Sequence, residues 1–233
     1  GEGAAMSGTV VVTGAARGIG RAIGERLQAE GYTVVGVDIG DGLADTSFEP
    51  VQVDLTSPDG PEVVDRAVER LGQPLVAVVN NAGITRDARL VNLKEDDVAA
   101  VLDVNLGAAY RLTRALIPRL EAGSSIVNLA SRAYLGNFGQ FNYSMSKGGV
   151  AGMTRALALE LAPDVRVNAI APGLIATEMS MAIPEDIRTK MVDNIPLGRM
   201  GEPSEVADLV AWLIRPGYIT GEVIVIGGGR SLA

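Results

Sequence analysis

Tyr143 and Lys147 lie four residues apart in the segment Tyr-Ser-Met-Ser-Lys, a spacing that places a phenol beside an ammonium on one face of a helix. A free phenol has a pKa of about 10 and exchanges protons poorly at neutral pH. A nearby positive charge favours the phenolate, and lowering the pKa by about three units requires about 4 kcal/mol. Lys147 and a positively charged cofactor ring could supply that free energy together. The same spacing also occurs on solvated helix faces without function, so the interpretation depends on the rest of the chain.

A glycine-rich turn follows a predicted strand at residues 9–13 and precedes a predicted helix at residues 21–30. Its glycines, Gly14, Gly18 and Gly20, have the spacing GxxxGxG rather than the commoner GxGxxG. Glycines allow a tight turn and let a pyrophosphate approach the backbone, while the N-terminus of the helix attracts the anion. The turn therefore predicts a dinucleotide site, with a plain strand-to-helix turn as the alternative.

Asp38 ends the second predicted strand, about 20 residues after the glycines, where a carboxylate can hold the hydroxyls of an adenosine ribose. A 2′-phosphate at this point would be repelled, so Asp38 favours NAD over NADP. The alternative is a turn residue at a strand end. Arg17 argues the other way, because a basic residue beside the glycines could pair with a 2′-phosphate. We give Asp38 the greater weight.

Composition excludes several classes of function. The 233 residues contain no His and no Cys, which removes Cys nucleophiles, His bases, disulfides and the usual zinc ligands, and we expect no metal site. A net charge of −8 argues against a nucleic-acid partner. No apolar run is long enough to span a bilayer and no signal peptide opens the chain, so we expect a cytoplasmic protein without a membrane partner. Residues 1–5 have the character of a cloning remnant before Met6.

Strand and helix patterns alternate along the chain. Strands are predicted at residues 9–13, 33–37, 51–53, 75–79, 125–129, 165–170 and 223–226, and helices at 21–30, 61–71, 96–120 (bent near Gly107), 143–161 and 204–214. The alternation predicts an α/β fold: a single-domain, Rossmann-type, doubly wound parallel sheet over residues 6–233. Residues 39–50 show no helical period, and residues 176–199 are irregular and rich in methionine.

Together these motifs resemble the short-chain dehydrogenase/reductase family, over essentially the whole chain from Met6. The resemblance rests on TGAARGIG at residues 13–20, NNAG at 80–83, YSMSK at 143–147 and PG at 172–173. Within that family, NNAGITRD, GNFGQFNYSMSKGGV and VRVNAIAPGLIATEM are most similar to 3-oxoacyl-thioester reductases and 3-hydroxyacyl dehydrogenases.

The resemblance implies four catalytic residues. Tyr143 would be the general acid in ketone reduction and the base in alcohol oxidation, with Lys147 lowering its pKa and binding the nicotinamide ribose. Ser131 would hold the substrate oxygen, and Asn105 would hold a water that links Lys147 to solvent. The plain alternatives are that Ser131 is a turn residue at a strand end and that Asn105 is a polar helix residue bonded to backbone.

The resemblance also implies cofactor contacts along the carboxyl ends of the strands. Asp54 and Leu55 would flank the adenine, and the segment after residue 80 would pass the adenosine ribose, although Asn81 could serve structure alone. The full predicted set is Gly14, Arg17, Gly18, Ile19, Gly20, Asp38, Asp54, Leu55, Asn81, Ala82, Gly83, Tyr143, Lys147, Pro172, Gly173, Ile175 and Thr177.

Three departures from the family pattern concern the surroundings of the site. Ser131 lies twelve residues before Tyr143, where many relatives have thirteen, which indicates a differently shaped pocket. The stretch between Asp38 and Asp54 is too short and polar for the family's usual helix. The basic residues that carrier-protein-dependent relatives place near residues 121–123 and 162–164 are absent, which makes an acidic acyl-carrier protein a less natural partner. Residues 176–199 would form the lid, with ordinary packing of two short helices as the alternative.

These features predict an NAD(H)-dependent oxidoreductase that moves hydride between nicotinamide and a secondary alcohol or its ketone, with a 3-hydroxyacyl or 3-oxoacyl thioester as the leading substrate class. The alternatives are another small ketone, diol or sugar alcohol, a non-catalytic dinucleotide-binding regulator, or an epimerase of the family's extended branch, for which the chain is too short. The resemblance also implies a homotetramer, paired through the helices at 96–120 and 143–161 and around the last strand.

Overall fold

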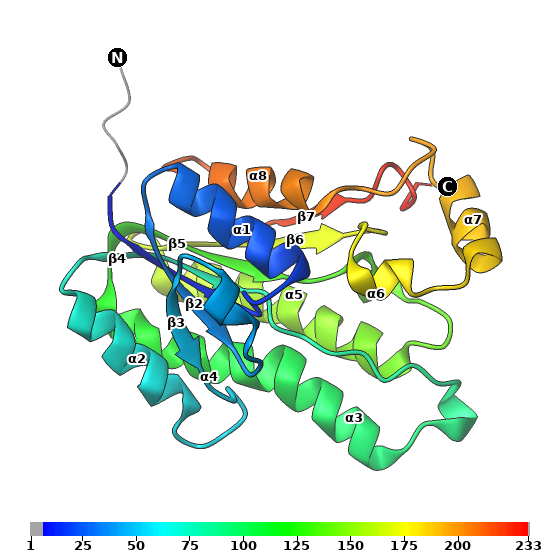
Figure 1. Ribbon diagram of the computed structural model, residues 1–233, viewed down its shortest axis with the longest axis horizontal. Helices are drawn as coiled ribbons and strands as arrows, with labels where there is room; N and C mark the ends of the chain where they lie inside the picture. Colours follow the sequence, from blue (N-terminus) through cyan, green and yellow to red (C-terminus); the bar gives the residue numbers. More distant parts are fainter. Residues whose placement is uncertain (1–6, 233) are drawn as a thin grey trace.

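A computed structural model describes residues 7–232, which form one parallel sheet of seven strands (Figure 1). The strands are β1 (Thr9–Thr13), β2 (Thr33–Asp38), β3 (Glu49–Gln52), β4 (Leu75–Asn80), β5 (Leu120–Leu129), β6 (Arg166–Pro172) and β7 (Val223–Ile226). Their spatial order is β3-β2-β1-β4-β5-β6-β7, and all neighbours are parallel. The predicted Rossmann-type sheet is confirmed. The expected cloning remnant at residues 1–5 lies outside the described residues.

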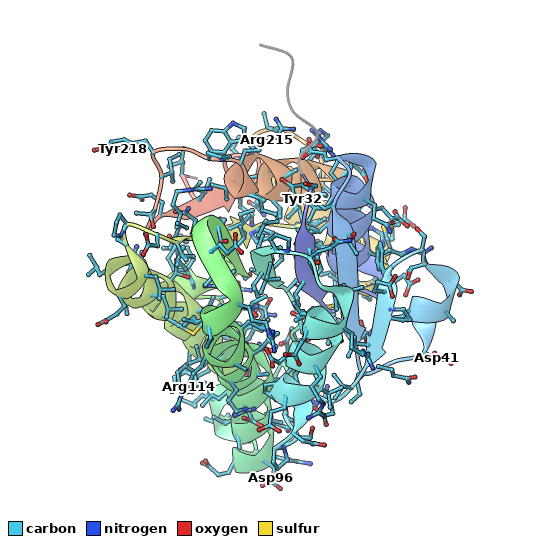
Figure 2. All side chains as sticks on the ribbon, turned by 90° about the vertical axis from the view of Figure 1, so that its left-hand side faces the viewer. Tyr32, Asp41, Asp96, Arg114, Arg215 and Tyr218 are labelled. Carbon is cyan, nitrogen blue, oxygen red and sulfur yellow. The ribbon has the colours of Figure 1, made fainter. Side chains whose placement is uncertain are left out.

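Helices cover both faces of this sheet (Figure 1). They are α1 (Gly18–Ala29), α2 (Gly60–Leu71), α3 (Glu95–Leu102), α4 (Ala108–Leu116), α5 (Phe141–Leu161), α6 (Glu178–Met181), α7 (Glu185–Asp193) and α8 (Pro203–Ile214). Helices α1 and α8 lie together on one face, and α2, α4 and α5 lie on the other. Arg26 of α1 donates to Asp208 of α8 at 2.7 Å, and Glu30 pairs with Arg215, which Figure 2 labels at the end of α8.

Alternation along the central strand builds two hydrophobic cores. Val10 and Val12 of β1 are fully buried against α1 and α8, while Val11 is fully buried against the helices of the opposite face. Successive side chains of a strand point to opposite faces, so a continuous run of valines serves both cores at once. The strand order reverses between β1 and β4, and the carboxyl ends of these two strands therefore form the crevice where such folds bind ligands.

Several element boundaries differ from the prediction. The helix expected at residues 96–120 is interrupted by a π-helical turn at Asp103–Gly107 and ends at Leu116. A 3₁₀ turn with Pro118 follows, because the ring of a proline fixes φ and removes a donor, and β5 then begins at Leu120 rather than at residue 125. Helix α1 begins at Gly18, inside the glycine turn, and residues 176–199 contain α6 and α7.

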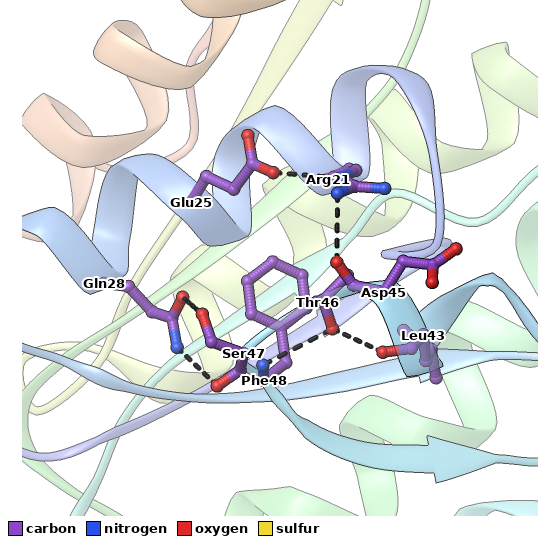
Figure 3. Close-up of polar contacts among 8 residues, drawn as sticks. All are labelled: Arg21, Glu25, Gln28, Leu43, Asp45, Thr46, Ser47 and Phe48. Carbon is purple, nitrogen blue, oxygen red and sulfur yellow. Dashed lines mark hydrogen bonds and ion pairs between the residues drawn. The ribbon is translucent and has the colours of Figure 1, made fainter.

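The segment between β2 and β3 replaces the family's usual helix with a single 3₁₀ turn at Gly42–Asp45, as expected from its length. The ring of Phe48 fills the space beneath it: a Cβ added to Gly24 of α1 would lie 2.4 Å from that ring. Figure 3 shows the polar contacts that fix the segment, including Ser47 with Gln28 at 2.8 Å and Arg21 with the carbonyl of Asp45 at 3.2 Å. Among residues 7–232, no helix has the length and apolar character needed to cross a membrane.

Candidate active site

Helix α5 presents Tyr143 and Lys147 together, with Lys147 Nζ 5.7 Å from the centroid of the Tyr143 ring. Lys147 is buried, and its Nζ donates a 2.7 Å hydrogen bond to the carbonyl of Leu129, the last residue of β5. Burial penalises the charged ammonium and lowers the pKa of Lys147 to about 8. The structure thus places the phenol and the amine side by side, at the carboxyl end of a central strand.

Ser131 follows β5 and bonds the Tyr143 side chain. Ser131 Oγ also accepts the N–H of Ala133 at 3.1 Å, which caps the 3₁₀ turn at Arg132–Leu135. The pKa of Tyr143 is raised: burial is the largest cause, the bond with Ser131 opposes it, and the carboxylate of Asp87 adds to it. In the chain by itself the shift is thus upward, because the burial of the phenol dominates and the ammonium is bonded to Leu129. The lowering of this pKa by Lys147 together with a cofactor ring stays a prediction.

Asn105 lies in the π-helical turn and is buried. Its Oδ1 accepts the N–H of Ile84 at 2.8 Å, and its Nδ2 donates to the carbonyl of Ile84 and to Ser146 Oγ, both at 3.0 Å. The side chain therefore connects the loop after β4 to α5, next to Lys147. These bonds match the alternative that Asn105 is a polar helix residue bonded to backbone. The water that would link Lys147 to solvent stays a prediction.

The glycine turn has the geometry that a phosphate needs. Gly14 and Gly18 have φ of +65° and +57°, and a Cβ added to Gly20 would lie 2.0 Å from the carbonyl oxygen of Gly14. No side chain caps the N-terminus of α1, where Arg17 occupies the cap position. Ile19, also expected at the cofactor, packs partly against the hydrophobic core. The first turn of α1 thus keeps backbone N–H groups for an anion.

Asn81 supports this turn from the neighbouring strand. Its Nδ2 donates to the carbonyls of Thr13 and Gly14 at 2.9 and 3.3 Å. The N–H groups of Asn81 and Ala82 donate in turn to Thr13 Oγ1, at 2.9 and 3.0 Å. The Asn81 side chain therefore joins the carboxyl ends of β1 and β4, which is the structural role held open for it. A Cβ added to Gly83 would lie 3.5 Å from Lys147 Nζ, so this loop passes over the lysine.

Asp38 is held rigidly at the end of β2. Its Oδ2 accepts the N–H of Ala16 from the glycine turn at 3.0 Å, and its Oδ1 accepts the N–H of Gly40 at 3.0 Å. Arg17 points elsewhere, toward Glu178 at 3.9 Å, and both side chains are exposed. The carboxylate thus lies beside the turn, with lone pairs left for a ligand.

The two residues expected beside the adenine differ in character. Asp54 accepts the N–H and hydroxyl of Thr56 at 2.8 and 2.7 Å, and these bonds lower its pKa. Leu55 is buried in the core with α2 and α4, so its side chain faces the interior. Only its backbone is left as a contact for an adenine ring.

The segment after β6 closes the opposite side of the crevice. Pro172 ends β6, and the N–H of Gly173 donates to Ile226 at 2.9 Å. Ile175 is buried, and Thr177 caps α6 through reciprocal bonds with Ser180. A Cβ added to Gly18 would lie 3.8 Å from Thr177 Cγ2, so the segment at 172–177 reaches the glycine turn.

These groups fit a nicotinamide dinucleotide. The chain supplies a turn in which an added Cβ would strike backbone, an uncapped helix N-terminus, and a carboxylate at the end of the second strand. Of the predicted catalytic residues, Ser131 follows the carboxyl end of β5, and Tyr143 and Lys147 lie beside that strand end on α5. Among residues 7–232, no three His, Cys, Asp or Glu side chains gather as a metal site would require.

A buried chain of amide and hydroxyl groups escaped the sequence reasoning. Asn80 Nδ2 donates to Thr113 Oγ1 of α4 at 2.9 Å and to Asn128 Oδ1 of β5 at 2.8 Å. Asn128 Nδ2 donates to Thr154 Oγ1 of α5 at 2.9 Å. Asn128 directly precedes Leu129, so adjacent residues of β5 bind α5 at Thr154 and at Lys147. The available signal was an asparagine within an otherwise apolar predicted strand.

Comparisons with known proteins agree with this geometry. A family profile described as "Enoyl-(Acyl carrier protein) reductase" matches residues 14–231. The chain is 42% identical over 236 residues to a 3-oxoacyl-(acyl-carrier-protein) reductase FabG of Thermotoga maritima, covering 94% of this chain and 96% of the relative. It is 42% identical over 229 residues to an acetoacetyl-CoA reductase of Synechocystis sp., covering 95% of each.

Solved structures show the same likeness. A short-chain dehydrogenase/reductase of Brucella melitensis, described as a glucose/ribitol dehydrogenase, superposes with a TM-score of 0.90 at 36% identity, covering 95% of this chain and 96% of that one. Sequence profile, relatives and fold agree over nearly the whole length. The chain therefore belongs to the short-chain dehydrogenase/reductase family, whose members are oxidoreductases that use a nicotinamide dinucleotide.

Proposed function

We propose that this protein is an NAD(H)-dependent oxidoreductase that interconverts a secondary alcohol and its ketone, with a 3-hydroxyacyl or 3-oxoacyl thioester as the leading substrate. The observation that carries the proposal is the convergence of Ser131, Tyr143 and Lys147 at the carboxyl end of β5, beside the crevice between β1 and β4. A regulator that only binds dinucleotides has no need of a proton donor bonded to a serine at this place.

The residues divide the work of the reaction. A nicotinamide dinucleotide, when bound, exchanges a hydride with the substrate carbon. Ser131 and Tyr143 hydrogen-bond the substrate oxygen, and Tyr143 gives its phenolic proton to that oxygen in ketone reduction and takes it back in alcohol oxidation. Lys147 favours the phenolate that remains, and Asn105 fixes the loop and helix that flank the lysine. The raised pKa of Tyr143 keeps the phenol protonated and ready to donate.

The preference for NAD over NADP rests on Asp38 and on the positions of the nearby cations. A 2′-phosphate beside the Asp38 carboxylate would be repelled, by about 1 kcal/mol at 4 Å in water and about 4 kcal/mol near a protein surface. Arg17 points toward Glu178, and Arg21 donates to Glu25 at 2.9 Å (Figure 3). Neither guanidinium is directed at Asp38, so neither would offset the repulsion between its carboxylate and a 2′-phosphate.

The thioester class is supported by the names of two relatives, a 3-oxoacyl-(acyl-carrier-protein) reductase and an acetoacetyl-CoA reductase. A CoA thioester suits the net charge of −8 better than an acidic carrier protein does. The description of the Brucella melitensis structure as a glucose/ribitol dehydrogenase keeps a sugar alcohol as the second candidate.

A spectrophotometric screen at 340 nm tests the proposal. Purified protein is given NADH or NADPH with acetoacetyl-CoA, simple ketones, diketones and ketoses, and in the reverse direction NAD⁺ with the matching alcohols. We expect the fastest oxidation of NADH with acetoacetyl-CoA. Turnover of a ketose alone would select the second candidate, and no turnover with any carbonyl would refute an enzymatic role.

We also keep a homotetramer and a cytoplasmic location as predictions. The family resemblance implies pairing through the helices that the structure resolves as α3, α4 and α5, and around β7. The outer surface between α3, α4 and α5 includes Leu102, Leu106, Tyr110 and Met153, an apolar set that suits such an interface. Light scattering of the purified protein tests the first prediction, and cell fractionation tests the second.

A further inference from the structure

Two arginines near the proposed site, Arg132 and Arg230, are half-buried, and their side chains have no partner among residues 7–232. Among residues 7–232, the side chains that make no hydrogen bond, ion pair or ring contact include those of Arg70, Arg132, Arg155 and Arg230. Arg70 and Arg155 are solvent-exposed, as unpaired arginines usually are, whereas Arg132 and Arg230 are both half-buried. A half-buried guanidinium without an acceptor forgoes hydrogen bonds that its planar fork is built to make.

The sheet brings these two arginines to the same edge. Leu129 of β5 is paired with Ile170 of β6, and Pro172 of β6 is paired with Ile226 of β7. Arg132 comes three residues after Leu129 and immediately after Ser131. Arg230 comes four residues after Ile226. Both therefore follow the carboxyl ends of strands that flank β6, on the side where Ser131 and Tyr143 lie.

The backbone that carries Arg230 is fixed in place. The N–H of Arg230 donates to Gly227 at 3.1 Å, and the carbonyl of Gly228 accepts the N–H of Leu197 at 3.1 Å. Gly227 packs closely on Gly173: a Cβ added to Gly173 would lie 2.8 Å from the Cα of Gly227. The turn at 227–230 is thus held between the segment after β6 and the end of the expected lid, which places Arg230 at the carboxyl end of β7.

The positive charges of Arg132 and Arg230 lie near enough to repel each other. Burial lowers the pKa of Arg230, and the positive charge of Arg132 lowers it further. No carboxylate among residues 7–232 bonds either guanidinium. Two neighbouring cations without a counter-ion are unfavourable in the protein alone and become favourable when an anion binds both.

We propose that Arg132 and Arg230 form an oxyanion subsite that binds a carboxylate or phosphate group of the substrate, next to the Ser131–Tyr143 pair. The two arginines present fork-shaped donors, which bind carboxylate and phosphate oxygens in a bidentate manner. This inference rests on the proposed function, because it concerns the substrate of the same site. It adds that the substrate is anionic near the reacting carbonyl or along its thiol arm.

Two pairs of substrates separate the sources of the anion. Acetoacetyl-CoA carries phosphates, and S-acetoacetyl-N-acetylcysteamine has the same thioester without them. Acetoacetate carries a carboxylate, and ethyl acetoacetate is its neutral ester. Steady-state reduction is measured for the wild type, Arg132→Gln and Arg230→Gln, with Arg70→Gln as the control for loss of one surface charge.

We expect each of the two variants to raise KM about tenfold or more for the anionic member of one pair, since a hydrogen bond to a charged group contributes that much. KM for the neutral member and for NADH should stay within about twofold of wild type, and Arg70→Gln should change neither. A change with acetoacetyl-CoA identifies a phosphate as the ligand, and a change with acetoacetate identifies a carboxylate.

Calorimetry provides a readout that needs no turnover. CoA and malonate are titrated into the protein saturated with NAD⁺, and we expect one of them to bind and to weaken about tenfold in both variants. If no substrate is reduced but this binding and its loss are seen, the subsite stands and the proposed function fails. If the substrates are reduced while KM and binding are equal in all four proteins, or if neither probe binds the wild type, the subsite is refuted.

Discussion

The ammonium of Lys147 lies 2.7 Å from the carbonyl oxygen of Leu129, inside the protein and at the last residue of the strand that leads to Ser131. This bond fixes α5 to the carboxyl end of β5 and thereby sets where Tyr143 stands relative to Ser131. It also places a charge where burial opposes it, so the pKa of Lys147 falls to about 8. The Lys147 side chain therefore both positions α5 at the site and makes the stability of the fold depend on pH.

This coupling predicts a pH dependence of stability that Lys147→Met removes. The pKa of Lys147 is about 8 in the folded chain and about 10.5 when exposed, so between these values the unfolded chain binds more protons. Stability contributed by this group is therefore absent below about pH 8 and rises with pH above it, by up to about 3 kcal/mol. We expect Lys147→Met to flatten the rise in unfolding free energy between pH 7.5 and pH 10, measured with urea at fixed protein concentration.

Lys94→Met is the matched control, because Lys94 is exposed. We expect this variant to show the same dependence of unfolding free energy on pH as the wild type. Loss of the hydrogen bond to Leu129 should lower the unfolding free energy of Lys147→Met at every pH, so it should not affect how that free energy changes with pH. Equal slopes in the wild type and Lys147→Met would show that the buried amine is not the titrating group.

Replacing Tyr143 with Phe removes the phenolic proton and keeps the ring. We expect kcat to fall by about 100-fold or more, as is usual when a general acid is lost, while the dissociation constant of NADH changes by less than about threefold. Stopped assays give kcat, and quenching of intrinsic fluorescence gives NADH binding. Tyr218→Phe is the control, since Tyr218 is fully exposed after α8. Wild-type turnover by Tyr143→Phe would remove this residue from the mechanism.

The sequence predicted the parts of the fold that local chemistry decides. Runs of valine gave the central strands, and the glycines around Gly14 gave the turn that leads into α1. The start of β5 was missed because residues 121–123 are exposed and residues 120–124 lack a β-branched run. The pairing of Leu120 with Leu75 of β4 defines this start instead. The end of a strand is hard to predict from local sequence when pairing with a neighbouring strand determines it.

In the candidate site, too, local spacing was predictable from the sequence, whereas features that depend on distant contacts were not. The relation of Tyr143 to Lys147 follows from helical spacing, and the structure places them together as expected. The direction of the Tyr143 pKa could not be predicted from that spacing, because its largest cause is the burial of the phenol by distant segments. The bonds between Asn80, Asn128 and Thr154 join residues up to 48 positions apart and depend on the register of β4 and β5.

Asp38→Ala tests the origin of cofactor preference. Loss of the carboxylate removes its repulsion of a 2′-phosphate, so we expect the ratio of kcat/KM for NADH over NADPH to fall about tenfold or more. Asp41→Ala is the control, because Asp41 is exposed at the outer edge of the molecule beyond β2 (Figure 2). The variant also loses the acceptors for Ala16 and Gly40, so its melting temperature is measured beside the kinetics. A wild type that prefers NADPH would contradict the interpretation of Asp38.

Thr154→Val tests the buried polar chain beneath the site. Valine keeps the shape of threonine and removes the hydroxyl that accepts from Asn128 Nδ2 at 2.9 Å, which leaves a buried amide without its partner. An orphaned buried donor costs about 1–3 kcal/mol, so urea unfolding should show a loss of this size. Thr154→Ser keeps the hydroxyl and loses only a methyl group, and it should retain more stability than Thr154→Val. If the valine variant is the more stable of the two, methyl packing rather than the hydrogen bond holds α5 against β5.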